Sequence, residues 1–258
     1  MEAILKTERF EIRCKENTVE QDLLWESHCH TQYEAISVLE GDILIMEEGA
    51  TYRLTARQTA VIPPLSYHTV TANKKSLYRR VTTLFDRDAI PPPLRDRFTS
   101  DASRAPVILS DHGKRLMKAV TASDPQFYAP LADSIMVDLL YRYVEGEHVG
   151  TVSEADATLQ EILAYIDAHL TEQIRIADIA THTALSESSV SHLFKRHMQI
   201  SPKQYILEKR LALAGSLIRG GMPPTLAAIR IGYDSYSNFY RLYKKHFGIS
   251  PAESHTSE

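Results

Sequence analysis

The sequence predicts an α+β protein of more than one domain, with an N-terminal β-barrel and an all-α C-terminal domain that contains two helix-turn-helix units. Short apolar runs separated by turn residues fill the stretch 25–70, which is typical of an all-β domain. A polar segment with two glycines, 146–155, has the composition of a linker. In the helical region after it, a nine-residue segment occurs twice, 49 residues apart.

These patterns give three expected regions. Residues 1–105 are expected to form the barrel, because Glu40-Gly41-Asp42 and Glu48-Gly49-Ala50 place turns between apolar runs. Residues 106–150 are expected to form a segment for coupling or dimerisation and a linker, and residues 151–258 the helical domain. Two helices are expected in the middle region, at about 111–122 and 126–145, and could pack on the barrel or on a second copy of the chain. The apolar residues expected to be buried on the second helix are Leu131, Ile135, Val137, Leu139 and Leu140.

Composition and charge restrict the class of protein. Hydrophobic residues make up 43% and charged residues 24% of the chain, and no apolar run approaches the roughly 20 residues that a membrane span needs, so we expect a cytoplasmic protein. Cys14 and Cys29 are too few for a disulfide framework. The net charge is −4, yet residues 195–245 contain ten basic and two acidic residues. A local basic stripe is typical of a surface that contacts phosphates, although a solvated helix face has the same composition.

The internal repeat also predicts where two helices begin. Residues 194–202, FKRHMQISP, recur as YKKHFGISP at 243–251. Ser201 and Ser250 each precede a proline and are followed three positions later by Gln204 or Glu253. This pattern is a capping box with proline at the first helical position, so each serine is expected to start a helix.

A helix, a turn of small residues and a second helix are expected before each copy of the repeat. In the first unit Ala180, Ala184, Val190 and Leu193 have the spacing of a helix-turn-helix, in which small residues allow two helices to cross closely. Ala228, Gly232, Phe239 and Leu242 have the same roles in the second unit, with one extra residue in the turn. A duplicated helical scaffold with no role in DNA binding is the alternative.

The region from about 157 to 253 resembles the AraC/XylS family of transcriptional regulators. The second unit matches the family pattern at 227–233 (AAIRIGY), 239–244 (FYRLYK) and 248–251 (GISP). The first unit agrees at several positions but has His192 where the family often has arginine.

This resemblance implies that helices at about 187–198 and 235–246 enter successive major grooves of DNA. Side chains opposite the apolar faces of these helices are the candidates for base contacts: Ser188, Ser191, His192, Tyr236, Ser237, Tyr240 and Arg241. Arg241 is the strongest candidate, because its planar guanidinium can bind guanine through two hydrogen bonds. The candidates for phosphate contacts lie later on the same helices: Lys195, Arg196, Lys244 and Lys245. Arg210 could join them or form a structural ion pair.

The N-terminal half resembles the cupin superfamily. The run H-x-H-x(3)-E-x(6)-G begins at His28, and residues 63–68 (PPLSYH) resemble the second cupin motif, although Leu65 replaces its glycine and Arg57 stands at the turn glycine. The resemblance implies that His28, His30, Glu34 and His68 could hold a transition metal. A metal-free effector pocket or structurally satisfied histidines are the alternatives. The expected pocket residues are Trp25, His28, His30, Tyr33, Glu34 and His68.

Together these features predict a regulator of transcription that binds DNA and responds to a small effector, for which a sugar is one candidate. The family resemblance favours an activator that contacts RNA polymerase, and a homodimer is expected. We expect no enzymatic activity, no catalytic residue, no obligate cofactor and no membrane contact. The competing hypotheses are a metal-dependent cupin enzyme fused to a DNA-binding domain and a helical interaction module that does not bind nucleic acid.

Overall fold

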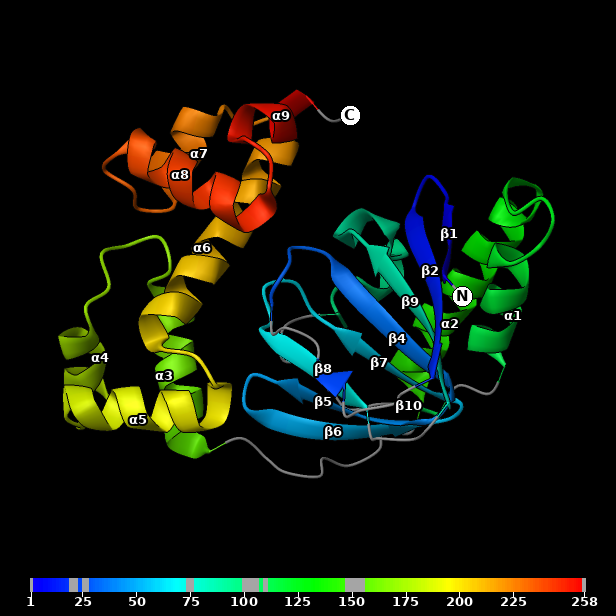
Figure 1. Ribbon diagram of the computed structural model, residues 1–258, viewed down its shortest axis with the longest axis horizontal. Coiled ribbons are helices and arrows are strands. Elements are labelled where there is room, and N and C mark those ends of the chain that lie inside the picture. Colours follow the sequence, from blue (N-terminus) through cyan, green and yellow to red (C-terminus); the bar gives the residue numbers. More distant parts are fainter. Residues whose placement is uncertain are drawn as a thin grey trace. The chain divides into compact units, whose positions relative to one another are not determined.

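The computed structural model describes residues 2–18, 23–24, 28–72, 77–98, 107–108, 111–146 and 156–256. They form two compact units (Figure 1), here called the N-terminal and C-terminal domains, and the short segment His28–Thr31 is grouped with the second unit. Among the described residues, no helix has the length and apolar character needed to cross a membrane.

The N-terminal domain contains two antiparallel sheets with an apolar core between them. This core includes Ile36 and Ile62 from one sheet and Ile45, Leu54 and Val70 from the other. The six-stranded sheet has the order β1 (Glu2–Lys6), β2 (Phe10–Thr18), β9 (Leu77–Phe85), β4 (Tyr33–Glu40), β7 (Gln58–Ile62) and β10 (Val107–Ile108). The four-stranded sheet has the order β3 (Leu23–Leu24), β8 (His68–Ala72), β5 (Asp42–Glu47) and β6 (Ala50–Thr55). Two facing sheets fit the predicted barrel.

The predicted turn between β5 and β6 is a tight hairpin. Glu48 and Gly49, which join the two strands, have φ angles of +46° and +82°. Two consecutive positive φ angles match the right-handed twist of the strands that the turn connects.

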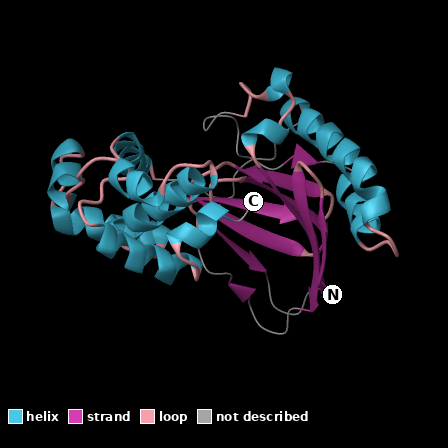
Figure 2. Cartoon of the chain, turned by 90° about the horizontal axis from the view of Figure 1, so that it is seen from above, coloured by secondary structure: helices cyan, strands magenta, loops and turns pink. Residues whose placement is uncertain are grey.

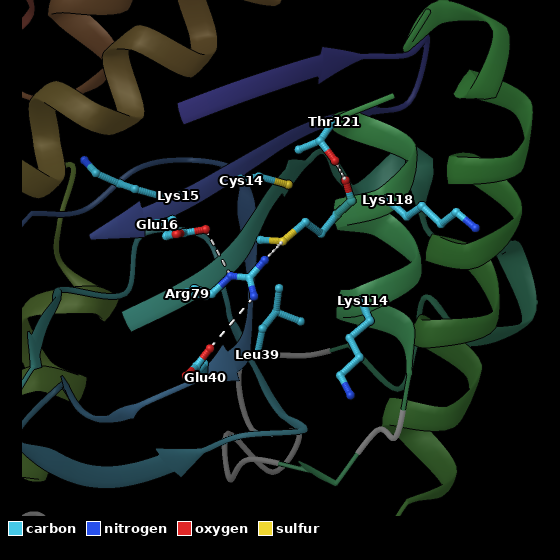
Figure 3. A pocket seen from close by; sticks show the side chains of 10 residues that line it. Cys14, Lys15, Glu16, Leu39, Glu40, Arg79, Lys114, Lys118 and Thr121 are labelled. Carbon is cyan, nitrogen blue, oxygen red and sulfur yellow. Dashed lines mark hydrogen bonds and ion pairs between the residues drawn. The ribbon is translucent and has the colours of Figure 1, made fainter. Parts of the chain in front are cut away.

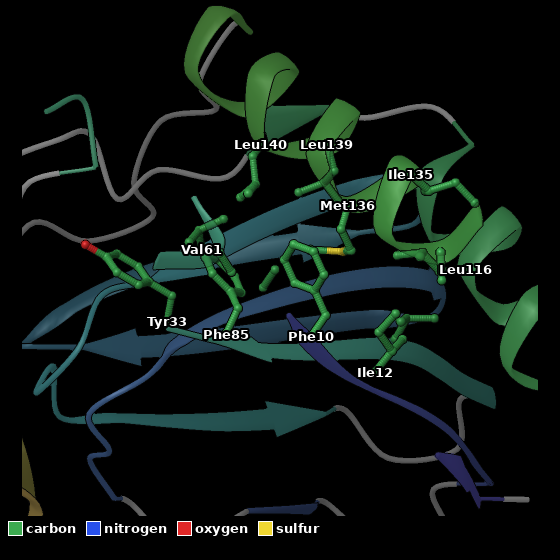
Figure 4. Packing of buried hydrophobic residues seen from close by; sticks show 14 of the residues in the cluster. Phe10, Ile12, Tyr33, Val61, Phe85, Leu116, Ile135, Met136, Leu139 and Leu140 are labelled. Carbon is green, nitrogen blue, oxygen red and sulfur yellow. The ribbon is translucent and has the colours of Figure 1, made fainter. Parts of the chain in front are cut away.

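Helices α1 (His112–Val120) and α2 (Ala129–Glu145) cover the outer face of the six-stranded sheet (Figure 2). Short 3-10 turns occur at Arg87–Ala89, Pro92–Leu94 and Gln126–Tyr128. Leu116, Ile135, Met136, Leu139 and Leu140 of the two helices share a core with Phe10, Ile12 and Phe85 of the sheet (Figure 4). The two predicted helices therefore pack on the barrel itself.

The expected burial of Leu131 is wrong. Its side chain is 46% exposed, whereas Ala132, Ile135, Met136, Leu139 and Leu140 are fully buried. The buried positions follow one face of the helix at intervals of three and four residues. Leu131 lies just outside that face, and Met136 takes the buried position that the sequence analysis did not assign.

The C-terminal domain is entirely helical in its described part. Its helices are α3 (Ala157–Ala168), α4 (Ile176–His182), α5 (Glu187–Met198), α6 (Pro202–Arg219), α7 (Pro224–Arg230), α8 (Tyr236–Phe247) and α9 (Pro251–Thr256). Ser201 is the N-cap of α6, and its Oγ accepts a hydrogen bond from the Gln204 amide. At the start of α9 the Ser250 amide donates to Glu253 Oε2 at 2.6 Å, and the Glu253 amide donates to Ser250 Oγ at 3.3 Å. Both predicted helix starts are therefore confirmed.

Candidate nucleic-acid interface and barrel site

The first helix-turn-helix consists of α4, a short turn and α5. Ala180 of α4 and Val190 and Phe194 of α5 are buried where the two helices meet. The turn contains Ala184, which has a φ of +54°, and the Leu185 amide donates to the Ala180 carbonyl at 2.9 Å. The side chain of Ser186 then caps α5 by accepting from the Ser189 amide.

The second helix-turn-helix, formed by α7 and α8, repeats this arrangement. Gly232 stands in its turn with a φ of +84°, and a Cβ atom at this position would lie 3.1 Å from the Thr171 carbonyl oxygen. Only glycine fits this turn without strain, because it combines a left-handed backbone with close packing against another chain segment. Phe239 and Tyr243 fill the inner face of α8, and Ser235 caps its N-terminus.

The outer faces of α5 and α8 contain all seven candidates for base contacts. The exposed residues are Ser188, Ser191 and His192 on α5, and Tyr236, Ser237, Tyr240 and Arg241 on α8. Their exposure follows from helix geometry, since the positions between them, such as Val190 and Phe239, are buried. Each recognition helix is thus polar on one side and packed on the other.

The candidates for phosphate contacts are also exposed. Lys195, Arg196, Lys244 and Lys245 lie in the last turns of their helices. None of the four forms an ion pair with a residue that the structure describes. Their charges therefore remain available to a polyanion.

Two basic residues of the same stripe have structural roles instead. Arg210 donates from Nε to the Leu170 carbonyl at 2.7 Å and from Nη2 to the Glu172 carbonyl. It is half-buried, and burial lowers its pKa. Lys209 is 3% exposed and donates to Asp167 Oδ1 at 2.6 Å and to the Tyr205 hydroxyl at 3.0 Å. Arg210 has no carboxylate partner among the described residues, and its guanidinium donates to backbone carbonyls instead.

Sequence reasoning missed Asn238 on the exposed face of α8. Its Oδ1 atom accepts a hydrogen bond from Nη2 of Arg241 at 3.1 Å. An asparagine amide can bind adenine through two hydrogen bonds, so Asn238 joins the candidates for base contacts. Its spacing of three residues from Arg241 on a helix could have indicated the pairing.

In the barrel, Glu34 of β4 and His68 of β8 form a buried pair. His68 Nε2 lies 3.0 Å from Glu34 Oε2, and His68 Nδ1 lies 3.0 Å from the Ser66 carbonyl oxygen. Burial alone would lower the pKa of His68, but the hydrogen bond and negative charge of Glu34 outweigh it, and the pKa is raised. The Ser66 hydroxyl donates to Glu47, which is also buried, at 2.6 Å.

The structure brings the predicted metal ligands together. The candidate ligand atoms of His28, His30, Glu34 and His68 all lie within 4.8 Å of one another. The rings of His28 and His30 have centroids 5.7 Å apart. Three imidazoles and one carboxylate at this spacing fit the donor set that a first-row transition metal prefers.

The expected place of Tyr33 in the pocket is wrong, and Trp25, the other aromatic residue expected there, lies outside the described residues. Tyr33 precedes Glu34 on the same strand, so its side chain points to the opposite face of the sheet. It stacks on Phe85 with a centroid distance of 5.4 Å and donates from its hydroxyl to the Phe98 carbonyl at 2.7 Å. Tyr33 therefore belongs to the core beneath α2.

The two departures from the cupin motifs leave the local backbone in the left-handed region. Arg57 has a φ of +74° and Leu65 a φ of +60°. Glycine adopts such angles freely, whereas a residue with a side chain does so at a cost of order 1 kcal/mol. Arg57 and Leu65 therefore hold backbone conformations that glycine would adopt without this cost.

Comparison with known proteins finds similarity in part of the chain. Residues 179–256 match the model of a helix-turn-helix domain. The HTH-type transcriptional regulator GbdR of Pseudomonas aeruginosa is 28% identical over 166 residues, which cover 62% of this chain. The arabinose operon regulatory protein of Escherichia coli is 32% identical over 125 residues, or 48% of this chain. The matching stretch covers 43% of each relative.

Among solved structures, ToxT from Vibrio cholerae O395 aligns with 98% of this chain and 100% of its own, at 12% identity and a TM-score of 0.45. GbdR is named as a transcriptional regulator, and the Escherichia coli relative is named as a regulatory protein of the arabinose operon. The family pattern at 227–233 and 248–251 lies within the matched region. Residues 179–256 therefore form a helix-turn-helix domain.

Proposed function

We propose that the protein is a sequence-specific DNA-binding regulator of transcription. The observation that supports this most directly is the pair of helices α5 and α8, each with a buried inner face and an outer face of exposed polar side chains. Exposed lysine and arginine side chains at the ends of both helices add positive charge where a duplex would lie. A scaffold without a nucleic-acid partner has no need for this combination.

Each recognition helix would read one segment of the major groove. Arg241 would donate two hydrogen bonds to a guanine, and Asn238 would orient its guanidinium through their hydrogen bond. Lys195, Arg196, Lys244 and Lys245 would hold the backbone phosphates and fix the register of the helices on the DNA without selecting a sequence.

Selection of a binding site from random duplex DNA, followed by fluorescence anisotropy at several salt concentrations, tests this proposal. We expect one enriched sequence and an affinity that falls steeply with salt, because bound cations are released from the phosphates. The same titration on duplexes of unrelated sequence gives the non-specific reference. Affinity that is absent, or independent of salt, would show that the helical domain is an interaction module of another kind.

We further propose that the N-terminal domain binds a small effector, a sugar among the candidates, and that the protein acts as a homodimeric activator in the cytoplasm.

Exposed apolar side chains on and before α2 support dimerisation: Phe127 is 75% exposed and Leu131 46%, and Tyr128 and Tyr141 are also exposed. Light scattering of the wild type and of Phe127→Ser/Leu131→Ser tests this surface, and a dimer unchanged by the double variant would contradict it. Contact with RNA polymerase is implied by the family resemblance.

A metal ion held by His28, His30, Glu34 and His68 is the second proposal for the barrel, favoured by the spacing of their ligand atoms. A bound metal would supply a Lewis acid that could hold an oxygen atom of an effector. The test is the metal content of protein purified without an affinity tag, compared with the His28→Ala/His30→Ala variant. The double variant His169→Ala/His182→Ala, on the C-terminal domain, is the matched control. Stoichiometric metal that only the first variant loses supports the site, and a metal-free wild type leaves an organic effector pocket.

A further inference from the structure

A groove with a volume of about 800 Å³ lies between α1 and the outer face of the six-stranded sheet (Figure 3). This volume is in the range of sites that hold small organic ligands. The groove lies on the helix-covered side of that sheet, whereas Glu34 and His68 pair on its other side. Its lining comes from β2, β4, β9 and α1 and comprises Cys14, Lys15, Glu16, Leu39, Glu40, Arg79, Lys114, Met117, Lys118 and Thr121.

Arg79 is held at the floor of the groove by two carboxylates. Its Nε atom lies 3.1 Å from Glu16 Oε2, and its Nη1 atom lies 3.8 Å from Glu40 Oε2. The Nε atom is buried but has no hydrogen bond of normal geometry to a described residue. The Nη2 atom donates to the sulfur of Met117 at 3.3 Å. A thioether is a weak acceptor, so an oxygen atom of a ligand would be a better partner for this guanidinium.

The charges around the groove favour an anion. Four cationic side chains line it, against the two carboxylates of Glu16 and Glu40. Lys15, Lys114 and Lys118 form no ion pair with any residue in the described part of the chain. The two carboxylates offset two of the four positive charges, so the lining keeps a net positive charge of two, and Lys114 and Lys118 place positive charge along the α1 side.

The same groove has an apolar wall. Leu39 and Met117 contribute side chains that pack against the main core of the domain. Cys14 lies beside them, and burial raises the pKa of its thiol to about 12, so the sulfur is neutral and acts as a small apolar group. A ligand that fits both the apolar wall and the basic side chains therefore combines an apolar body with one negatively charged head.

We propose that this groove is a binding site for a small amphipathic organic anion, distinct from the barrel interior. The apolar body of the ligand lies against Leu39 and Met117. The anionic oxygen atoms, from a carboxylate, sulfonate or phosphate, accept hydrogen bonds from Arg79, Lys114 and Lys118. Charge-assisted hydrogen bonds of this kind are the strong polar contacts of such sites.

The experiment uses the full chain and two fluorescent probes of nearly the same shape. Anilinonaphthalene sulfonate has an apolar body with an anionic head, and N-phenylnaphthylamine is its neutral counterpart. The test variant is Lys114→Gln/Lys118→Gln, and the control is Arg115→Gln, which removes an exposed charge from the same helix outside the groove. Thermal unfolding of each variant checks that the fold is retained, as expected for exposed side chains.

We expect saturable binding of the sulfonate by the wild type and a Kd that rises at least about tenfold in the double variant, with little change in Arg115→Gln. The neutral probe is expected to bind more weakly than the sulfonate to the wild type and equally to all three proteins. No saturable binding of the sulfonate, equal binding by the double variant, or tighter binding of the neutral probe would each overturn the proposal. None of these results depends on whether the protein binds DNA.

Discussion

Helix α5 of the first helix-turn-helix and helix α8 of the second have the same packing but different exposed chemistry. Phe194 and its counterpart in the repeat, Tyr243, are both fully buried at the inner faces, and serine caps both helices. On the outer face α5 offers two serines and a histidine, whereas α8 offers Arg241, Asn238 and two tyrosines. The comparison teaches that the duplicated scaffold is maintained by its core, while the surface is free to diverge.

The first helices of the two units differ in the same way. Leu226 and Ile229 of α7 are 54% and 68% exposed. The positions that correspond to them in α4 are occupied by Asp178 and Thr181, which are also exposed. Asp178 accepts a hydrogen bond from the Arg175 amide at 3.0 Å and so closes the N-terminus of α4. The second unit starts α7 with Pro224 instead, which needs no amide partner at that position.

The largest effect is expected from the shared core. Phe194→Ala and Tyr243→Ala, at equivalent positions of the repeat, should each lower the free energy of unfolding by about 3–5 kcal/mol, because each removes a fully buried ring and leaves a cavity. Urea denaturation of the two variants is the measurement, with the exposed Ser188→Ala as the control. If one variant loses much more unfolding free energy than the other, the two units do not depend equally on this core position.

The next effect distinguishes the two recognition helices. Arg241→Ala should weaken binding to the selected DNA by about 1–3 kcal/mol and relax the preference for one base pair, because a bidentate contact to guanine is lost. Ser191→Ala/His192→Ala should have a smaller effect, since Ser191 Oγ already donates to the Glu187 carbonyl at 2.9 Å.

Anisotropy with the selected duplex and its single-base variants measures both effects. Arg97→Ala, an exposed arginine of the N-terminal domain, is the control for loss of charge alone. If the double variant on α5 relaxes base preference more than Arg241→Ala does, the first unit is the main reader and this comparison is reversed.

A smaller and more uniform effect is expected from the lysines at the helix ends. Lys195→Ala and Lys244→Ala should each reduce the slope of log affinity against log salt by about 1, because one released counterion is lost. The loss should be the same on specific and unrelated duplexes. A change in base preference in either variant would mean that the lysine contacts a base.

Local signals in the sequence predicted much of this fold, because their physical causes are local. Ser201 and Ser250 indicated helix starts through caps that close within three residues. The helix-turn-helix spacing depended on Ala180 and Gly232, whose small size the turn requires. The side chains of Glu34 and His68 lie within hydrogen-bond distance because the alternation of side chains along a strand places both on the inner face of the barrel.

Features that depend on distant contacts were not predictable in this way. Lys209 and Arg210 were counted in the basic stripe, but Asp167 and the carbonyl of Leu170, about 40 positions earlier, take up their charges. Leu131 was expected in the core, but the packing of α2 on the sheet decides which helix face is buried, and the spacing of apolar residues within the helix does not specify this. A role for Arg79 could not be predicted from the sequence, because the groove forms only when α1 packs against strands β2, β4 and β9.

The smallest effect concerns the two copies of the capping box. Hydrogen bonds to Ser250 lower the pKa of Glu253 below its usual value of 4.5. A carboxylate whose pKa is lower in the folded state stabilises that state above the unfolded pKa, and this stabilisation is lost as the pH falls through the folded pKa. The first copy has Gln204, which does not titrate and whose side chain donates to Glu208 at 2.7 Å.

Amide hydrogen exchange should therefore show that α9 loses protection as the pH falls below about 4.5, once the intrinsic pH dependence of exchange is removed. The start of α6, which Ser201 caps and which has the non-titrating Gln204 at the position of Glu253, should not respond. Glu253→Gln should make α9 behave like α6, because the amide keeps the hydrogen-bonding shape of the box without its charge. A pH response that persists in Glu253→Gln would place its origin outside the cap.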